Sequence, residues 1–252
     1  MGYTFDNPFV VFSVFLVAQW FAAFVGDLLG RSKRLKAEEQ EDFAVLRTAT
    51  LTLLALLIGF GFSMAVSRYD QRKDYEAAEA NAIGAEYGRA DMLPTQDTVK
   101  VRSLLLQYAN LRVAFYEAGD ERQIGEIGAH TTKIQAELWS LVSHAAAAQP
   151  TPLVALAVSG MNDVLNSQRR TQAAWWNRIP VAAWWLLGLI AIACNVLIGY
   201  GERQSSALVL LILPIVVSIS FFLIADIDSP RGGVIRVLPQ NLIAVSQFMN
   251  PQ

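Results

Sequence analysis

Four long apolar runs, at residues 8–29, 46–66, 179–200 and 206–225, constrain the fold of this chain more than any other feature. Each run has about 20 residues, which is the length that a helix needs to cross a hydrocarbon core of about 30 Å. The chain is 54% hydrophobic and 17% charged, whereas charged residues make up about 25% of a typical soluble domain. Trp175, Trp176 and Tyr200, which suit a membrane–water interface, lie in or beside these runs. The runs therefore predict four transmembrane helices.

The segment between the second and third runs, residues 67–178, has the pattern of a soluble helical bundle. Apolar residues recur there at helical spacing in four stretches, and turns are predicted near Pro94, Gly119 and Pro150. The positions expected to face the bundle core are Tyr75, Ala78, Ala82, Ile83 and Tyr87; Val101, Leu104, Leu105, Tyr108, Leu111 and Phe115; Ile124, Ile127, Ile134, Leu138 and Leu141; and Leu153, Leu156, Val164 and Leu165. No strand pattern competes with these helices.

The predicted fold class is therefore all-α, with four transmembrane helices and a helical bundle inserted between helices two and three. Residues 1–66 hold the first two transmembrane helices, residues 67–178 the bundle, residues 179–226 the other two, and residues 227–252 a C-terminal segment. The stretch LTLLALLIGFGFSMAVSRYDQRKDYEAAEANAIG, residues 51–84, passes from apolar to charged without a proline. It predicts that the second transmembrane helix continues into the bundle.

Several classes of function are disfavoured by what the chain lacks. Its net charge of −2 provides no basic field for nucleic acid. Its one cysteine, Cys194, cannot form a disulfide within the chain or a cysteine metal site. No phosphate-binding GxxxxGK loop, GxGxxG turn or GxSxG elbow is present, and no carboxylate follows His130 or His144 by three or four residues. We expect a protein that is not an enzyme, needs no cofactor and has membrane lipids as partners.

A stripe of small and weakly polar residues marks the second transmembrane helix. Ala55, Gly59 and Ser63 lie four residues apart, and Thr52 lies beside them. Small residues at this spacing let two helix backbones pack closely. The same stripe suits the wall of a pore, with Leu56 and Phe60 on its flank as a hydrophobic constriction. Periodicity alone does not choose between these two interpretations.

The orientation of the chain in the membrane also stays open. Short loops carry Arg31, Lys33, Arg34, Lys36, Arg47 and Arg203, whereas the other side carries Arg68, Arg72, Lys73, Arg169, Arg170, Arg178, Arg231 and Arg236 near membrane ends. Positive residues favour the cytoplasmic side, but the rule depends on short loops, and long domains partly escape it. If only the short loops are counted, the bundle lies outside.

The end of the second apolar helix resembles the pore-neck helix of bestrophins, a family of pentameric chloride channels. Gly59-Phe60 is followed, eight residues after the Phe, by Arg68-Tyr69 at the start of RYDQRKDYE. A closer resemblance is to bacterial bestrophin-like membrane proteins of the DUF4239 family. It rests on RYDQR, EANAIG, RADMLP, NRIP and DIDSPRGGVIRVLPQ, and extends over nearly the whole chain.

This resemblance implies a homo-oligomeric, pentameric ion channel in a bacterial inner membrane, with inorganic ions as its cargo. The pore-lining positions would be Thr52, Leu56, Gly59, Phe60 and Ser63, and the charges at the pore mouth Arg68, Asp70 and Arg72. The bundle would extend the conduit and lie, with both termini, in the cytoplasm. Basic and acidic residues alternate at the mouth, so the sign of the ion is not predicted.

A second resemblance concerns calcium. ADIDSPRGG is similar to the bestrophin segment in which acidic residues precede Pro-Phe-Gly, and which clasps calcium in animal bestrophins. Asp226, Asp228 and Pro230 match, but Arg231 replaces the Phe and no acidic cluster follows Gly233. Because calcium takes six to eight oxygen ligands, the two Asp residues would supply only part of a site. Alternatively, they cap the membrane exit and pair with Arg68, Arg231 or Arg236.

A different class of function remains open. A helical bundle between two membrane helices also suits a membrane-anchored sensor or scaffold that binds a ligand in its bundle and conducts nothing. No recognisable output domain accompanies the bundle, which disfavours this alternative. The symmetry of the assembled particle, and the presence of an axial opening lined by helix two, would distinguish an ion channel from a sensor or scaffold.

Overall fold

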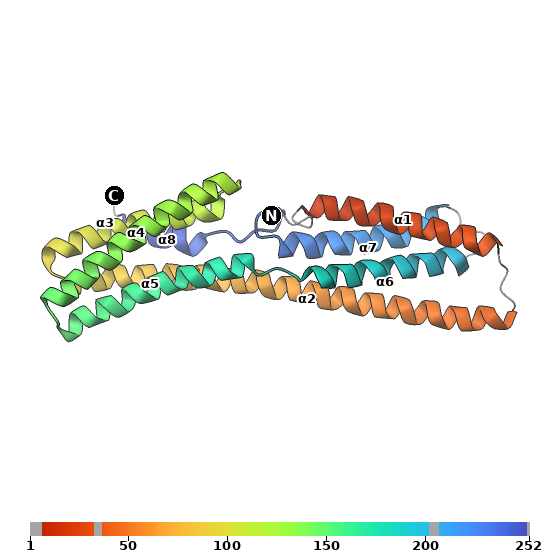
Figure 1. Ribbon diagram of the computed structural model, residues 1–252, viewed down its shortest axis with the longest axis horizontal. Helices are drawn as coiled ribbons and strands as arrows, with labels where there is room; N and C mark the ends of the chain where they lie inside the picture. The colour runs from red at the N-terminus through yellow and green to blue at the C-terminus, as the bar shows by residue number, and fades with distance from the viewer. Residues whose placement is uncertain (1–6, 33–36, 202–206, 251–252) are drawn as a thin grey trace. The chain divides into compact units, whose positions relative to one another are not determined.

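The structure is a computed structural model that describes residues 7–32, 37–201 and 207–250. These residues form helices and no strand, which confirms the all-α fold class (Figure 1). The helices are α1 (Pro8–Ser32), α2 (Ala37–Arg89), the 3₁₀ turn η1 (Ala90–Met92), α3 (Thr95–Glu117), α4 (Glu121–Ala148), α5 (Pro152–Trp176), α6 (Val181–Gly201), α7 (Ala207–Asp228) and α8 (Gln240–Met249).

The chain divides into two compact units. The membrane unit comprises Met1–Tyr69 and Arg178–Arg236, and the bundle unit comprises Asp70–Asn177 and Val237–Gln252. The helix α2 has 53 residues and contributes to both units, which confirms that the second apolar run continues as a helix into the bundle. The C-terminal segment predicted as one piece divides at Arg236, and its last part, including α8, belongs to the bundle unit.

The four predicted transmembrane helices correspond to α1, the apolar part of α2, α6 and α7. The structure has four helical spans that are long and apolar enough to cross a membrane, so the chain is an integral membrane protein. Lys33, Arg34, Lys36 and Arg203, on which the prediction of orientation depends, lie outside the described residues.

Within the membrane unit, α1 packs against α6 and α7. Glycines bring α1 and α6 together: a Cβ atom added at Gly199 would lie 2.0 Å from the carbonyl oxygen of Ala23, and one added at Gly26 would lie 2.2 Å from that of Val196. Any larger residue at these positions would push the two backbones apart. The core of the unit contains Val11, Leu54, Ala65, Ile179, Trp184, Leu187, Ala191, Cys194, Val217, Phe221, Ile224, Ala225 and Ile227.

A buried polar cluster joins the same three helices. Asn195 of α6 donates a hydrogen bond to Gln19 of α1 over 3.1 Å, and Gln19 donates to Ser218 of α7 over 3.3 Å. All three side chains are completely buried. Because hydrocarbon offers no alternative partners, these hydrogen bonds favour one register of the three helices.

The bundle unit consists of the second half of α2 with α3, α4, α5 and α8. The predicted turns are confirmed: α3 follows Pro94, Asp120 caps α4 by accepting a hydrogen bond from Gln123 N, and Thr151 caps α5 in the same way from Val154 N. The helix α8, which the sequence pattern did not predict, packs against α3.

The predicted core of the bundle is correct in α3 except for the half-buried Leu111, and partly wrong in α2, α4 and α5. Of the predicted positions in α4 only Leu138 is buried, together with Thr131, Val142 and Ala145. The buried residues of α3 include the predicted Val101, Leu104, Leu105, Tyr108 and Phe115. In α5, the predicted Leu153 and Leu156 are exposed, and the buried residues are instead Val154, Ala157, Gly160, Met161, Val164, Thr171, Ala174 and Trp175. In α2, the predicted Ala78 is exposed, whereas the buried residues include Arg72, Glu76, Glu79, Ala80, Ile83 and Glu86. Two of the charged side chains on this face, Glu76 and Glu79, have hydrogen-bond partners on other helices.

Candidate functional site

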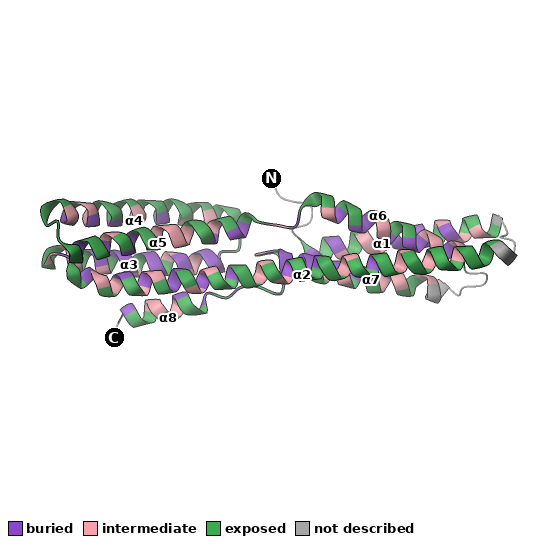
Figure 2. Ribbon diagram, turned by 90° about the horizontal axis from the view of Figure 1, so that it is seen from below, coloured by how far each residue is buried: buried purple, intermediate pink, exposed green. Residues whose placement is uncertain are grey.

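In the membrane unit, exposed residues follow one face of α2 along the helix (Figure 2). The predicted pore-lining residues Thr52, Leu56, Gly59, Phe60 and Ser63 all lie on it. The exposed fractions of Leu56 and Phe60 are 52% and 59%, although both are large apolar side chains. An exposed apolar face within a membrane helix contacts lipid, another copy of the chain or a pore.

The opposite face of α2 packs against the core of the membrane unit. This packing determines which face of the helix is exposed. Leu54 and Ala65 are buried in the core of the membrane unit. A Cβ atom added at Gly61 would lie 3.3 Å from Cδ1 of Ile224 in α7 and 3.6 Å from Cδ1 of Leu187 in α6. The Cys194 thiol donates a hydrogen bond to the carbonyl oxygen of Thr50 over 3.4 Å. The face that carries Thr52 and Ser63 is therefore held away from this core.

The small residues of α2 do not pack against another helix within the described part of the chain. A Cβ atom added at Gly59 would meet no atom of that part within 4 Å, and Ala55 and Ser63 are exposed. Close packing through glycine occurs instead between α1 and α6. The described part of the chain therefore leaves the α2 stripe open to lipid, a pore or a second copy.

The hydroxyl groups on the exposed face are partly satisfied by α2 itself. Thr52 donates a hydrogen bond to the carbonyl oxygen of Thr48 over 2.9 Å, and Thr48 donates in the same way to Ala44 over 2.9 Å. Each hydroxyl oxygen keeps lone pairs that can still accept hydrogen bonds. The face is thus weakly polar, and the hydroxyl donors of Thr48 and Thr52 are satisfied within the helix.

The three predicted pore-mouth charges have different environments. Asp70 is exposed and Arg68 is half-buried. Arg72 is only 2% exposed, so its side chain is buried within this chain. Its assignment as a pore-mouth charge stays a prediction.

The acidic residues at the end of α7 form a compact turn. The Asp226 carboxylate accepts hydrogen bonds from Val234 N over 2.7 Å and from Ile235 N over 2.9 Å. Gly233 makes this turn feasible, since a Cβ atom there would lie 2.6 Å from the carbonyl oxygen of Asp226. Asp226 therefore caps the backbone that follows α7.

Asp228 has a similar structural role. Its two carboxylate oxygens each lie 3.2 Å from Ile179 N, and one lies 3.6 Å from Nε of Arg178. N–H groups and the Arg178 guanidinium face these carboxylates and compete with a cation for their oxygens. Calcium binding at Asp226 and Asp228 stays a prediction. Among the described residues, no group of three or more His, Cys, Asp or Glu side chains could hold a metal ion.

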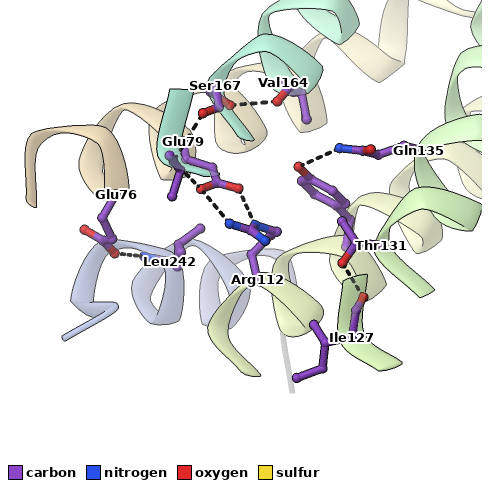
Figure 3. Close-up of polar contacts among 11 residues, drawn as sticks. Glu76, Glu79, Arg112, Ile127, Thr131, Gln135, Val164, Ser167 and Leu242 are labelled. Atoms are coloured by element: carbon purple, nitrogen blue, oxygen red, sulfur yellow. Dashed lines mark hydrogen bonds and ion pairs between the residues drawn. The ribbon is translucent and has the colours of Figure 1, made fainter. Parts of the chain in front are cut away.

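A buried charge cluster in the bundle unit escaped the sequence analysis. Glu79 of α2 forms an ion pair with Arg112 of α3, with 2.5 Å between Oε1 and Nε, and both side chains are buried (Figure 3). Thr171 of α5 donates to the other Glu79 oxygen over 2.9 Å, and the Arg112 guanidinium lies 4.4 Å from the Phe115 ring centre. Burial and the Glu79 carboxylate both raise the pKa of the neighbouring Tyr108 phenol. The cluster joins three helices.

Glu76 of α2 contacts α8 in the same unit. It accepts hydrogen bonds from Leu242 N over 2.9 Å and from Asn241 Nδ2 over 2.6 Å (Figure 3). The sequence signal for both clusters is the spacing of Arg72, Glu76, Glu79 and Glu86, which follows one helical face together with Ile83. A search for apolar periodicity ignores such a face.

Comparison with known proteins identifies the family. A model of the Bestrophin-like domain matches residues 10–242. The chain belongs to the bestrophin-like family. The match covers both the exposed face of α2 and the Asp226 turn, and it confirms the resemblance proposed from the sequence. No curated protein matches the bestrophin-like chain.

Solved structures of bestrophin homologues share the fold of the bestrophin-like chain. A bacterial bestrophin homologue from Klebsiella pneumoniae superposes with a TM-score of 0.64 at 14% identity, covering 94% of this chain and 96% of that one. A single-substitution variant of a bacterial bestrophin homologue from the same organism gives a TM-score of 0.66 at 13% identity, covering 94% and 93%. At such low identity, the likeness concerns the fold.

Proposed function

We propose that this bestrophin-like protein is a homo-oligomeric ion channel, a pentamer, in which the exposed face of α2 lines the pore. The observation that carries the proposal is this face itself: Leu56 and Phe60 are exposed beside Gly59, while the other side of the same helix is packed in the core. The family and the fold support a channel.

The chemistry of this face suits a hydrophobic neck. Rings of Leu56 and Phe60 around an axis would form a narrow, poorly wetted constriction, and ions resist such a constriction because they must shed water to enter it. Thr52 and Ser63, on either side of the rings, would offer hydroxyl groups that bind water. Inorganic ions are then the cargo, and membrane lipids cover the remaining apolar surface. We place the protein in a bacterial inner membrane, with the bundle on the cytoplasmic side.

Substitution of Phe60 tests the pore. In liposomes, Phe60→Ala should widen the neck and raise ion flux several-fold over the wild type. Phe24→Ala is a matched control, because Phe24 of α1 is 55% exposed and also lies in an apolar run, but on another helix. It should leave the flux unchanged. Leu57 of α2 is unsuitable as a control, because it packs against the core of the membrane unit.

The result separates the proposal from its alternative. If Phe60→Ala conducts no better than the wild type while the oligomer stays intact, α2 does not line a pore. Images of detergent-solubilised particles should show five-fold symmetry with an axial opening. A particle without such an opening would instead support a sensor or scaffold.

A further inference from the structure

Glu86, on α2 in the bundle unit, has an unusual environment for a carboxylate. Its side chain is 0% exposed. Neither carboxylate oxygen accepts a hydrogen bond from any described residue. The nearest cation is Arg89, one turn along the same helix, whose Nη1 lies 3.9 Å from Oε2. An ionised carboxylate that is buried without donors is strongly destabilised, because it has lost its hydration and gained little in return.

The two other buried glutamates of α2 lack this problem. Glu79 accepts hydrogen bonds from Arg112 and Thr171, and Glu76 accepts them from Asn241 and Leu242 N. Both carboxylates therefore have hydrogen-bond donors within the bundle unit. Glu86 is the buried acid of this helix face whose protein surroundings favour the neutral, protonated form instead.

The backbone of α5 closes directly over the Glu86 carboxyl group. A Cβ atom added at Gly160 would lie 2.0 Å from Oε2 of Glu86 and 2.3 Å from Nη1 of Arg89. Only glycine leaves room for the two side chains at this contact between α2 and α5. The main chain of α5 thereby keeps water from the carboxyl group. A change in the charge of this group therefore affects the contact between α2 and α5.

The charged groups around Glu86 come from the helices packed beside it. Burial is the main cause that raises its pKa, to about 8; Arg89 of α2 opposes this effect and Asp163 of α5 adds to it. In the adjoining η1 and α3, Asp91 and Arg102 form an ion pair with each other at 2.8 Å. Two neighbours of opposite sign thus act on the same carboxyl group.

We propose that Glu86 is a proton-binding site of the bundle, which holds a proton at the contact between α2 and α5 at neutral pH and releases it in alkaline solution, so that the contact weakens. This inference goes beyond conduction, and it holds whether or not the chain forms a channel. The ligand is a proton, and the part of the structure that responds is the contact between α2 and α5.

The direction of the pH effect follows from proton linkage. In the unfolded chain the Glu86 carboxyl has its ordinary pKa of 4.5, and in the folded chain the pKa is about 8. Between these values the folded chain binds a proton that the unfolded chain does not bind. The stabilising effect is therefore complete below the lower value, falls as the pH rises through this window, and is lost above the upper value.

Glu86→Gln tests the site, because the amide keeps the shape but cannot titrate. We would measure the full chain in detergent by infrared spectroscopy and by thermal unfolding, from about pH 5 to pH 9. The wild type should show a protonated-carboxyl band that disappears with a midpoint near the folded pKa, and a Tm that falls by several degrees. Glu86→Gln should lack that band and that fall. Glu126→Gln, at an exposed ion pair with Arg122 on α4, should behave as the wild type does.

Two further variants keep the test decisive if Glu86→Gln fails to fold. Asp163→Asn removes the like charge and should move the midpoint of the band to lower pH. Arg89→Gln removes the opposite charge and should move it to higher pH. Opposite shifts in these two variants support the site. A band that is absent from the wild type, or a midpoint that neither variant moves, would overturn it.

Discussion

At the scale of single residues, the ion pair between Glu79 and Arg112 shows how this bundle tolerates charge in its interior. Both side chains are buried, and Thr171 and the Phe115 ring complete the surroundings of the pair. Desolvation opposes such a pair, and only good geometry with additional hydrogen bonds offsets it. The presence of both partners therefore matters more than the strength of their attraction.

Arg112→Met should be strongly destabilising, because it leaves the Glu79 carboxylate buried without its cation. We expect the free energy of unfolding to fall by about 3–5 kcal/mol. The double variant Glu79→Gln/Arg112→Met should recover much of this loss, since no charge is then left in the core. Denaturant unfolding of the full chain in detergent measures both. Arg122→Met, at a surface pair, is the control and should change little. A single variant as stable as the wild type would contradict this role.

At the scale of elements, α8 depends on side chains supplied by the other helices. Its N-cap residue, Pro239, offers no side-chain hydrogen bond, and the Glu76 carboxylate accepts from Leu242 N in its place. At the other end, the Tyr87 hydroxyl donates to the carbonyl oxygen of Met249 over 3.3 Å. A carboxylate at a helix N-terminus also interacts favourably with the helix dipole. The residues that hold α8 in place thus lie at both of its ends.

Glu76→Ala should release α8 from the bundle. The variant leaves the first turn of α8 uncapped, and loss of a cap typically destabilises a helix by about 1 kcal/mol. Limited proteolysis should cut the chain near Gln240 faster in this variant than in the wild type. Glu117→Ala, an exposed glutamate at the end of α3, is the control. Equal cleavage rates in Glu76→Ala and the wild type would show that the cap does not hold the helix.

At the scale of the whole molecule, α2 is the element that both units share. Its apolar part lies in the membrane unit, and its charged part begins at Asp70. A single crossing of the bilayer by α2 places the residues before and after this apolar part on opposite sides of the membrane. In the function proposed above, the later residues lie in the cytoplasm.

Cysteine labelling in sealed vesicles checks this arrangement. With Cys194→Ala as the background, Glu41→Cys and Ser103→Cys should react with a membrane-impermeant reagent from opposite sides. Both positions are exposed in the structure and lie on either side of the apolar part of α2. Labelling of both from the same side would contradict a single crossing, and the side on which Ser103→Cys reacts gives the orientation.

The sequence alone determined the helices from α1 to α7 and their order, but not α8. Runs such as residues 46–66 have the length and apolar character of a membrane helix, and Pro94, Gly119 and Pro150 lie in the turns between the bundle helices. Packing within the membrane unit, not the pattern, decided that Gly61 faces inward while Gly59 faces outward. Likewise, only the structure shows that the Arg72 side chain is buried.

Only the tertiary structure decided which charged side chains are buried and which of them have hydrogen-bond donors. Glu76, Glu79 and Glu86 have the same side chain on the same face of α2, and nothing local distinguishes them. Their partners come from α3, α5 and α8, which lie far away along the chain. Glu86 differs because the backbone at Gly160 approaches it and no donor does. Helix formation depends on neighbours in sequence, whereas the solvation of a charge depends on neighbours in space.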